Sequence, residues 1–128
     1  MGQRVFEYAV VRIVPRVERE EFINAAVILF SPQQAFLGLE LRFDEARLRA
    51  LAPELDDPTV STLRRHLESL RAIAAGDPAG GPNAGLSQRE RFHFLVAPRS
   101  TMIQLSPVHS GLCDDAATAL RRLAESLL

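Results

Sequence analysis

The sequence contains no lysine, and all 15 of its basic residues are arginine. This absence excludes Schiff-base enzymes, P-loop nucleotide-binding proteins and protein kinases, because each needs a lysine at its reactive or phosphate-binding position. The glycine-rich patterns G-x-x-x-x-G-K and G-x-G-x-x-G are also absent. Codon bias in a GC-rich genome explains an all-arginine complement simply, and the exclusions hold whatever its cause.

Cysteine and long apolar runs are also scarce. The single cysteine, Cys113, has no partner for an internal disulfide, and no apolar run reaches the length that crosses a membrane. The first residues do not combine a basic segment with an apolar one, so no secretory signal is predicted. We therefore expect a cytoplasmic protein. The net charge of −1 does not indicate the excess of basic residues that is typical of nucleic-acid-binding domains. Neither nucleic-acid nor membrane binding is predicted.

The composition is that of an ordinary globular domain. Hydrophobic residues make up 47% and charged residues 24% of the 128 positions. A chain of this length buries about two thirds of its unfolded surface without help from a disulfide or a metal. The length therefore predicts a single domain over residues 1–128.

Three strands are predicted in the first third of the chain. β-branched and aromatic residues dominate 5–14 and 22–30, and a third such run covers 36–43. The connections are short, so the strands should form an antiparallel meander. Residues 101–105 suggest a fourth strand.

Helices are predicted after these strands. Asp44 is a suitable N-cap for a short helix, and Asp57-Pro58 is a suitable start for a longer one that Gly76 ends. Ser87 can cap a third helix, and Asp114-Asp115 precede a fourth. The sum is an α+β fold, with an antiparallel three- to four-stranded sheet and helices packed mainly on one face.

Residues 76–85, GDPAGGPNAG, form the only low-complexity segment. Glycine, proline, asparagine and aspartate dominate it, which predicts a flexible loop. Such a loop can act as a lid over a site, although a slack connector is the commoner case.

Four polar residues interrupt the otherwise apolar strands: Arg12, Asn24, Glu40 and Arg42. With symmetric turns, Arg12 faces Asn24, and Asn24 faces Arg42. Even-numbered side chains then share one face, and odd-numbered ones share the face that helices cover. On the even face the polar groups surround Ala26 and Gly38, which leave the kind of hollow that a pocket needs. The alternative is a rim of ion pairs without a binding role.

A second polar set lies near the C-terminus: Arg91, Arg99, Ser100, Gln104, His109 and Cys113. Cys113 activated by His109 would suit a nucleophilic enzyme, although Cys113 can equally be a small buried residue. Arg99 and Ser100, joined by Arg12 or Arg91, would suit an anion or nucleotide, although Arg99 can equally be a solvated loop residue. No C-x-x-C or H-x-x-x-H pattern occurs, so neither a metal nor a cofactor is predicted.

Two blocks, YAVVRIVPRVEREEFINAAVILFSP (8–32) and RERFHFLVAPRSTMIQLSPVHSGLC (89–113), resemble a bacterial domain-of-unknown-function family, the one numbered 3037. The resemblance is carried by Arg12, Pro15, Glu21, Phe22, Asn24, Arg91, Phe92, Ala97, Pro98, Arg99, Ser100, Gln104, His109 and Gly111. Ala26 stands where the family has glycine, which narrows the expected hollow. The resemblance implies a small cytoplasmic bacterial protein without an assigned activity, and a kinase-like protein encoded nearby as its partner.

The leading hypothesis is a non-catalytic accessory or interaction domain that acts through a protein partner or a small anionic ligand. One alternative is a nucleotide- or phosphate-binding enzyme subunit that uses Arg12, Arg99 and His109. Another is a cysteine-dependent hydrolase or transferase that uses Cys113.

Overall fold

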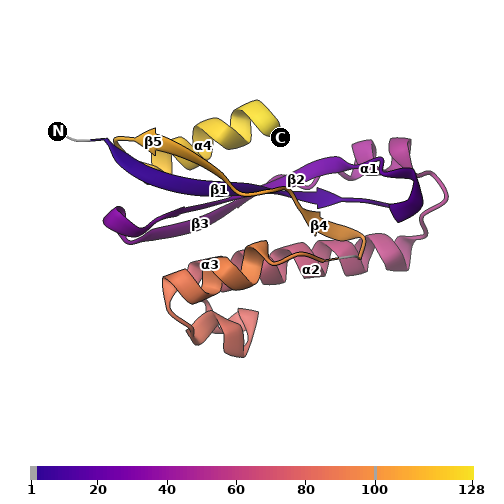
Figure 1. The fold of residues 1–128 in the computed structure, drawn as a ribbon. Coiled ribbons are helices and arrows are strands. Elements are labelled where there is room, and N and C mark those ends of the chain that lie inside the picture. The colour runs from indigo at the N-terminus through magenta and orange to yellow at the C-terminus, as the bar shows by residue number, and fades with distance from the viewer. Residues whose placement is uncertain (1–2, 100) are drawn as a thin grey trace.

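The fold centres on a five-stranded antiparallel sheet, seen in a computed structural model that describes residues 3–99 and 101–128 (Figure 1). The strand order is β3-β2-β1, and β4 and β5 both pair with the other edge of β1. The strands are β1 (Arg4–Ile13), β2 (Ile23–Ser31), β3 (Phe36–Leu41), β4 (Ile103–Leu105) and β5 (His109–Cys113). The predicted α+β class and its antiparallel meander are confirmed, whereas β5 is absent from the prediction.

The helices in the described chain are α1 (Glu45–Leu51), α2 (Asp57–Ala75), α3 (Gln88–Val96) and α4 (Ala116–Leu127). Each begins after a side chain that accepts a hydrogen bond from the backbone N–H three residues later: Asp44, Asp56, Ser87 and Asp115. These bonds satisfy donors that a helix start leaves free. The cap of α2 lies one residue before its predicted start, and Gly76 ends this helix at a φ of 72° as predicted.

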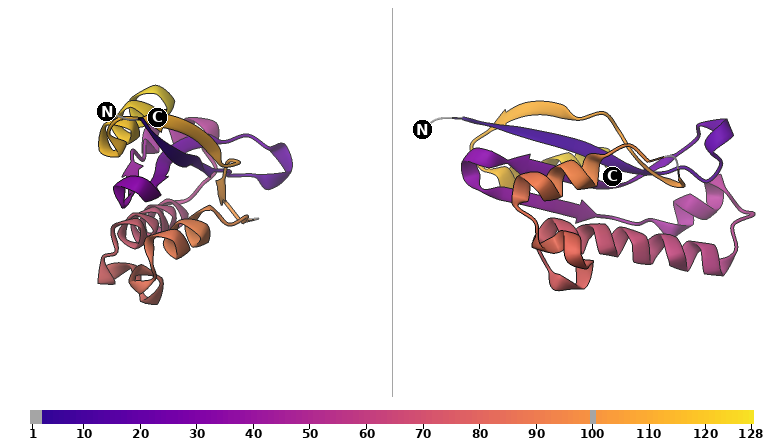
Figure 2. Two further views of the ribbon diagram at one scale, coloured as in Figure 1. Left: turned by 60° about the vertical axis from the view of Figure 1, so that its left-hand side comes forward. Right: turned by 60° about the horizontal axis from the view of Figure 1, so that its bottom comes forward.

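The helices form two layers, one on each face of the sheet (Figures 1 and 2). The apolar sides of α2 and α3 pack on one face, and Leu48 of α1 joins the same core. The other face packs on α4, where Leu120 contacts the core that contains Phe6, Val27 and Leu29. Three of the described helices therefore share one apolar core, in agreement with the prediction of helices mainly on one face.

The segment 76–85 forms two successive 3-10 turns, Pro78–Gly80 and Pro82–Gly85. Gly80 lies so close to α2 that a Cβ on it would approach Cγ1 and the backbone nitrogen of Ile73 to 2.8 Å. Ala84 is buried. The segment thus has an ordered contact with the end of α2, and its flexibility stays a prediction.

A β-bulge in β2 makes the predicted even and odd faces wrong for Ala26 to Phe30, whereas Ile23 and Asn24 lie on the predicted faces. Val10 pairs with Val27, whereas Arg12 pairs with Asn24, so Ala25 is an extra residue without its own partner. The expected pairing of Arg12 with Asn24 is confirmed. Between Glu7 and Val11 of β1, even positions of β1 share a face with odd positions of β2.

The second hairpin also departs from a symmetric turn. Ser31 pairs with Phe36 across a four-residue connection, which includes a 3-10 turn and Ala35 at a φ of 48°. Val27 therefore faces Glu40, and the predicted pairing of Asn24 with Arg42 is wrong. An even number of connecting residues shifts the register by one relative to the assumed turn.

The expected hollow around Ala26 and Gly38 does not form. Ala26 belongs to the core under α2 and α3, on the opposite face from Gly38. A Cβ on Gly38 would lie 3.0 Å from Cδ2 of Leu120, so α4 occupies the space above it. The glycine allows close approach of a helix to the sheet rather than entry of a ligand.

Ser106 joins the two strands that lie along β1. Its Oγ accepts a 2.8 Å hydrogen bond from the Val10 N–H, and its own N–H donates to the Val10 carbonyl at 2.9 Å. Pro107 follows, where the chain leaves the ladder between β4 and β5. The buried Ser106 hydroxyl thus accepts the hydrogen bond from Val10 that a backbone carbonyl would accept in an unbroken ladder.

Replacement of Ser106 by alanine should lower the free energy of unfolding by about 1–3 kcal/mol, because it leaves the buried Val10 N–H without an acceptor. Urea denaturation measures this loss. Ser110→Ala on exposed β5 is the matched control, and its effect should stay within about 0.5 kcal/mol. Equal losses in both variants would contradict a structural role for the Ser106 hydroxyl.

Candidate functional site

The structure brings three of the expected polar residues into one row across the sheet. Arg12 on β1 pairs with Asn24 on β2 and, at its other edge, with Gln104 on β4. Asn24 Nδ2 donates a 3.1 Å hydrogen bond to the carbonyl of Leu127 at the end of α4. The row therefore lies on the α4 face, at the end of that helix, and the two polar sets meet at Arg12 and Gln104.

The side chain of Arg12 is held without a polar partner. Its guanidinium carbon lies 4.3 Å from the centre of the Phe22 ring. Its Nε is buried and has no acceptor, and Oδ1 of the opposing Asn24 is buried without a donor. A buried unpaired donor typically costs about 1–3 kcal/mol. No ion pair of the described residues involves Arg12, Glu40 or Arg42, so the hypothesis of an ion-paired rim lacks support.

A groove of about 370 Å³ opens beside Arg12. It is lined by Arg12, Val14, Val17, Glu20, Phe22 and Gln104. Two of its apolar side chains are well exposed, Val17 at 46% and Phe22 at 42%. The groove thus combines one cation with an open apolar wall.

Glu40 and Arg42 do not line this groove. Glu40 is half-buried on β3 opposite Val27. Arg42 is exposed beyond the end of β3, and its backbone N–H donates to the Ala25 carbonyl at 2.9 Å. The first polar set is therefore divided, with only Arg12 and Asn24 adjacent.

The guanidinium of Arg99 is bound to backbone carbonyls at the end of α3. Its Nη1 donates to the carbonyl of Leu95 at 2.7 Å and to that of Ala97, and Nη2 donates to Phe94 at 3.2 Å. These carbonyls are the acceptors that a helix end leaves free. Partial burial lowers the pKa of Arg99. Ser100 lies outside the described residues, so its part in an anion site stays a prediction.

Arg91 also contacts backbone. Its Nη1 donates to the Leu86 carbonyl at 2.7 Å, and its Nε is buried without an acceptor. A Cβ on Gly76 would lie 3.6 Å from the Arg91 guanidinium, so this side chain packs on the end of α2. It does not line the groove at Arg12.

His109 and Cys113 stand at opposite ends of β5. His109 pairs with Tyr8, with the two rings 5.3 Å apart, and Cys113 pairs with Arg4. Four residue steps along the strand separate them by about 13 Å, which is far beyond hydrogen-bond reach. The dyad expected for a cysteine enzyme is therefore not assembled.

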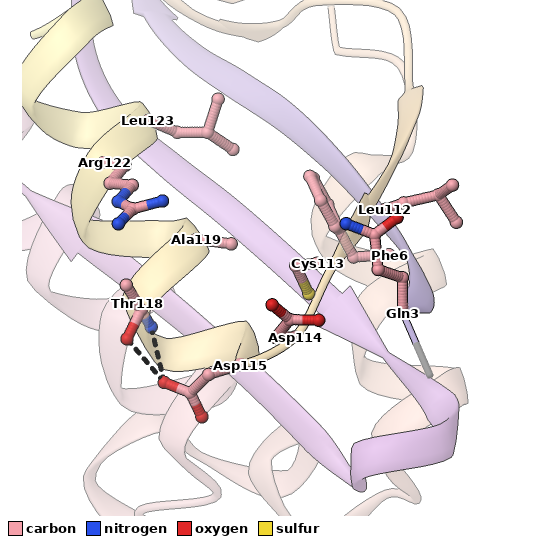
Figure 3. A pocket seen from close by; sticks show the side chains of 10 residues that line it. All are labelled: Gln3, Phe6, Leu112, Cys113, Asp114, Asp115, Thr118, Ala119, Arg122 and Leu123. Atoms are coloured by element: carbon pink, nitrogen blue, oxygen red, sulfur yellow. Dashed lines mark hydrogen bonds between the residues drawn. The ribbon is translucent and has the colours of Figure 1, made fainter. Parts of the chain in front are cut away.

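A second hollow, of about 370 Å³, lies at the start of α4, with Phe6, Cys113, Asp115 and Arg122 in its walls (Figure 3). The Asp115 carboxylate accepts from the backbone N–H of Thr118 at 3.0 Å and from its hydroxyl at 2.6 Å, and these bonds lower the pKa of Asp115. The Thr118 N–H at the start of the helix is thus engaged by the Asp115 cap.

Gln34 completes this helix start from the β2–β3 connection. Its Oε1 accepts from the Ala116 N–H at 2.9 Å. Its Nε2 donates to the Asp114 carbonyl at 3.4 Å and contacts the sulfur of Cys113 at 3.7 Å. These contacts give Cys113 a structural setting, as a small buried residue between the sheet and α4.

Sequence reasoning missed the edge at β5. Val5 and Leu112 are cross-strand partners and are exposed by 50% and 61%, and Val108 is exposed just before the strand. The available signal was the pair of apolar residues Val108 and Leu112 at even positions of this segment. The segment is short and follows Pro107, so the signal is weak. Exposed apolar side chains in a group mark interaction surfaces.

Two further features bear on the class of site. Within residues 3–99 and 101–128 no group of three or more histidine, cysteine, aspartate or glutamate side chains could hold a metal ion. None of the helices in these ranges is long and apolar enough to span a bilayer.

A family model described as "Protein of unknown function (DUF3037)" matches residues 8–128, which is nearly the whole chain. No curated protein and no solved structure matches the chain. The similarity thus supplies a family but no residue roles.

The Cys113 thiol should react with a disulfide reagent such as DTNB at least about tenfold more slowly in the folded protein than in urea, because the side chain is buried against α4. The absorbance of the released thiolate measures both rates. Equal rates in the folded and unfolded protein would contradict this packing and would favour the alternative hypothesis of a cysteine-dependent enzyme.

Proposed function

Because the chain belongs to the DUF3037 family, whose description assigns no activity, we propose from its surface that it is a non-catalytic interaction domain. It binds an extended segment of a partner protein along the free edge of β5. The observation that carries this proposal is the exposed cross-strand pair of Val5 and Leu112 beside an unpaired strand edge.

The free edge of β5 is suited to accept a further strand. Among the residues that the structure describes, the strand pairs with β1 alone, so its outward N–H and C=O groups are available. Proteins usually protect such edges with charges, prolines or bulges. The segment His109–Cys113 contains no arginine, no acidic residue and no proline. Pro107 and Asp114 flank it and limit an added strand to about five residues.

The opposite edge of the sheet, β3, is less accessible. Both α2 and α4 pack against β3, one from each face. Its side chains are all buried or half-buried, and Gln88 donates a 2.8 Å hydrogen bond to Ala35 just before it. A strand added there would meet helices on both sides, so β5 is the edge that fits a partner.

The chemistry of the surface defines the partner segment. Side chains of an added strand alternate between the two faces of the sheet. Val108 and Leu112 offer apolar contact, and the centre of the edge is uncharged. The occupant is therefore an extended segment with apolar residues at alternate positions. The kinase-like neighbour that the family resemblance implies is the first protein to test.

Leu112→Asp should abolish co-purification of a partner, because it places a charge on the contact surface. The tagged protein is co-expressed with the products of its neighbouring genes, and the retained protein is measured by size-exclusion chromatography and mass spectrometry. The matched control is Leu86→Asp, which makes the same substitution at an exposed leucine before α3 that belongs to neither β5 nor its partner strand.

The wild type and Leu86→Asp should retain the same partner in equimolar amount. Retention of that partner by Leu112→Asp would overturn the assignment to β5, provided that circular dichroism shows it folded. Failure of the wild-type protein to retain any neighbouring product would overturn the interaction role itself.

A further inference from the structure

We propose that the groove at Arg12 is a separate binding site for a carboxylate attached to a small apolar body. The groove lies beside the row of Arg12, Asn24 and Gln104, where β1 pairs with β4. The edge proposed for a partner protein lies along the other end of β1, where it pairs with β5. The two sites are therefore distinct, and this one does not depend on the partner proposal.

The guanidinium of Arg12 is the group that would bind the anion. In the described part of the chain its side chain makes no hydrogen bond and no ion pair, and its Nε is buried without an acceptor. Contact with the Phe22 ring at 4.3 Å holds the group in place. An oriented guanidinium matches the two oxygens of a carboxylate in a bidentate pair.

The charge of the groove favours a singly charged ligand over phosphate. Its lining contains one cation, Arg12, and one carboxylate, Glu20, which forms no ion pair with it. A second negative charge on the ligand would lack a counter-ion and would be repelled by Glu20. The lining contains no glycine and no N-terminus of an α-helix, which are the usual backbone cradles for phosphate.

The apolar wall defines the rest of the ligand. Val14, Val17 and Phe22 line the groove, and the last two are substantially exposed. A ring or branched aliphatic body would cover them in a space of about 370 Å³. Both a free organic acid and the C-terminal residue of a peptide have this chemistry.

NMR titration of the 15N-labelled protein with benzoate tests the site. Saturable shifts should occur at amides of the groove, among them Val14, Phe22 and Gln104. Arg12→Gln should weaken binding at least about tenfold, because it removes the charged pair. Arg42→Gln is the matched control, since it removes an exposed arginine after β3 that lies outside the groove, and it should leave the affinity unchanged. Benzamide, the neutral analogue, should not bind.

Two further measurements distinguish a peptide C-terminus from a free organic acid as the natural ligand. If the natural ligand is a peptide end, acetyl-Val-Phe with a free C-terminus should bind more tightly than benzoate, and its C-terminal amide should not bind. If it is a free acid, benzoate should bind at least as tightly as the peptide. Either result supports the site. Glu20→Gln should tighten the binding of both probes, because it removes a repulsive charge.

Three results would overturn the proposal: no saturable shift with either carboxylate probe, binding of inorganic phosphate or benzamide as tight as that of benzoate, or unchanged affinity in folded Arg12→Gln. If the spectrum shows that Arg12→Gln does not fold, Phe22→Ala replaces it, since Phe22 is exposed and its ring supports the guanidinium. Unchanged benzoate affinity in Phe22→Ala would then overturn the proposal.

Discussion

The register of the β1–β2 hairpin is the constraint on which the rest of the structure depends. One extra residue, Ala25, shifts β2 relative to β1, so Val27 and Leu29 face α4 while Ile28 and Phe30 face α2 and α3. Both cores follow from this shift, because a slip of one residue would exchange the two sets of side chains between the layers. The same shift places Asn24 beside Arg12 after the bulge and so creates the polar row.

The second edge of β1 explains why the molecule has two separate candidate surfaces. Ser106 interrupts the strand that lies along β1 while it keeps the hydrogen bonding of Val10 complete. On one side of the break, β4 brings Gln104 next to Arg12 and closes the groove. On the other side, β5 leaves a free, uncharged edge with Leu112 exposed. A short local interruption thus separates the two surfaces for which binding is proposed.

Local signals predicted the four described helices, because caps such as Asp44 and Ser87 act within four residues. They also predicted β1 to β4, including β4 within residues 101–105. The bulge could not be predicted, because the residues that follow Ala25, from Ala26 to Phe30, are apolar on both faces and no alternation marks the extra residue. Of the candidate site residues, Arg12, Asn24 and Gln104 converge, whereas His109 and Cys113 lie apart. Their distances depend on pairings between distant segments, which residue types alone do not specify.

Cross-strand nuclear Overhauser effects across the β1–β2 hairpin test this account most directly. The bulged register predicts contacts between Val10 and Val27 and between Arg12 and Asn24, with Ala25 opposite no residue of β1. An unbroken ladder in which Val10 faces Ala26 would contradict it. That result would place Val27 and Leu29 on the other face of the sheet and remove the basis for both cores.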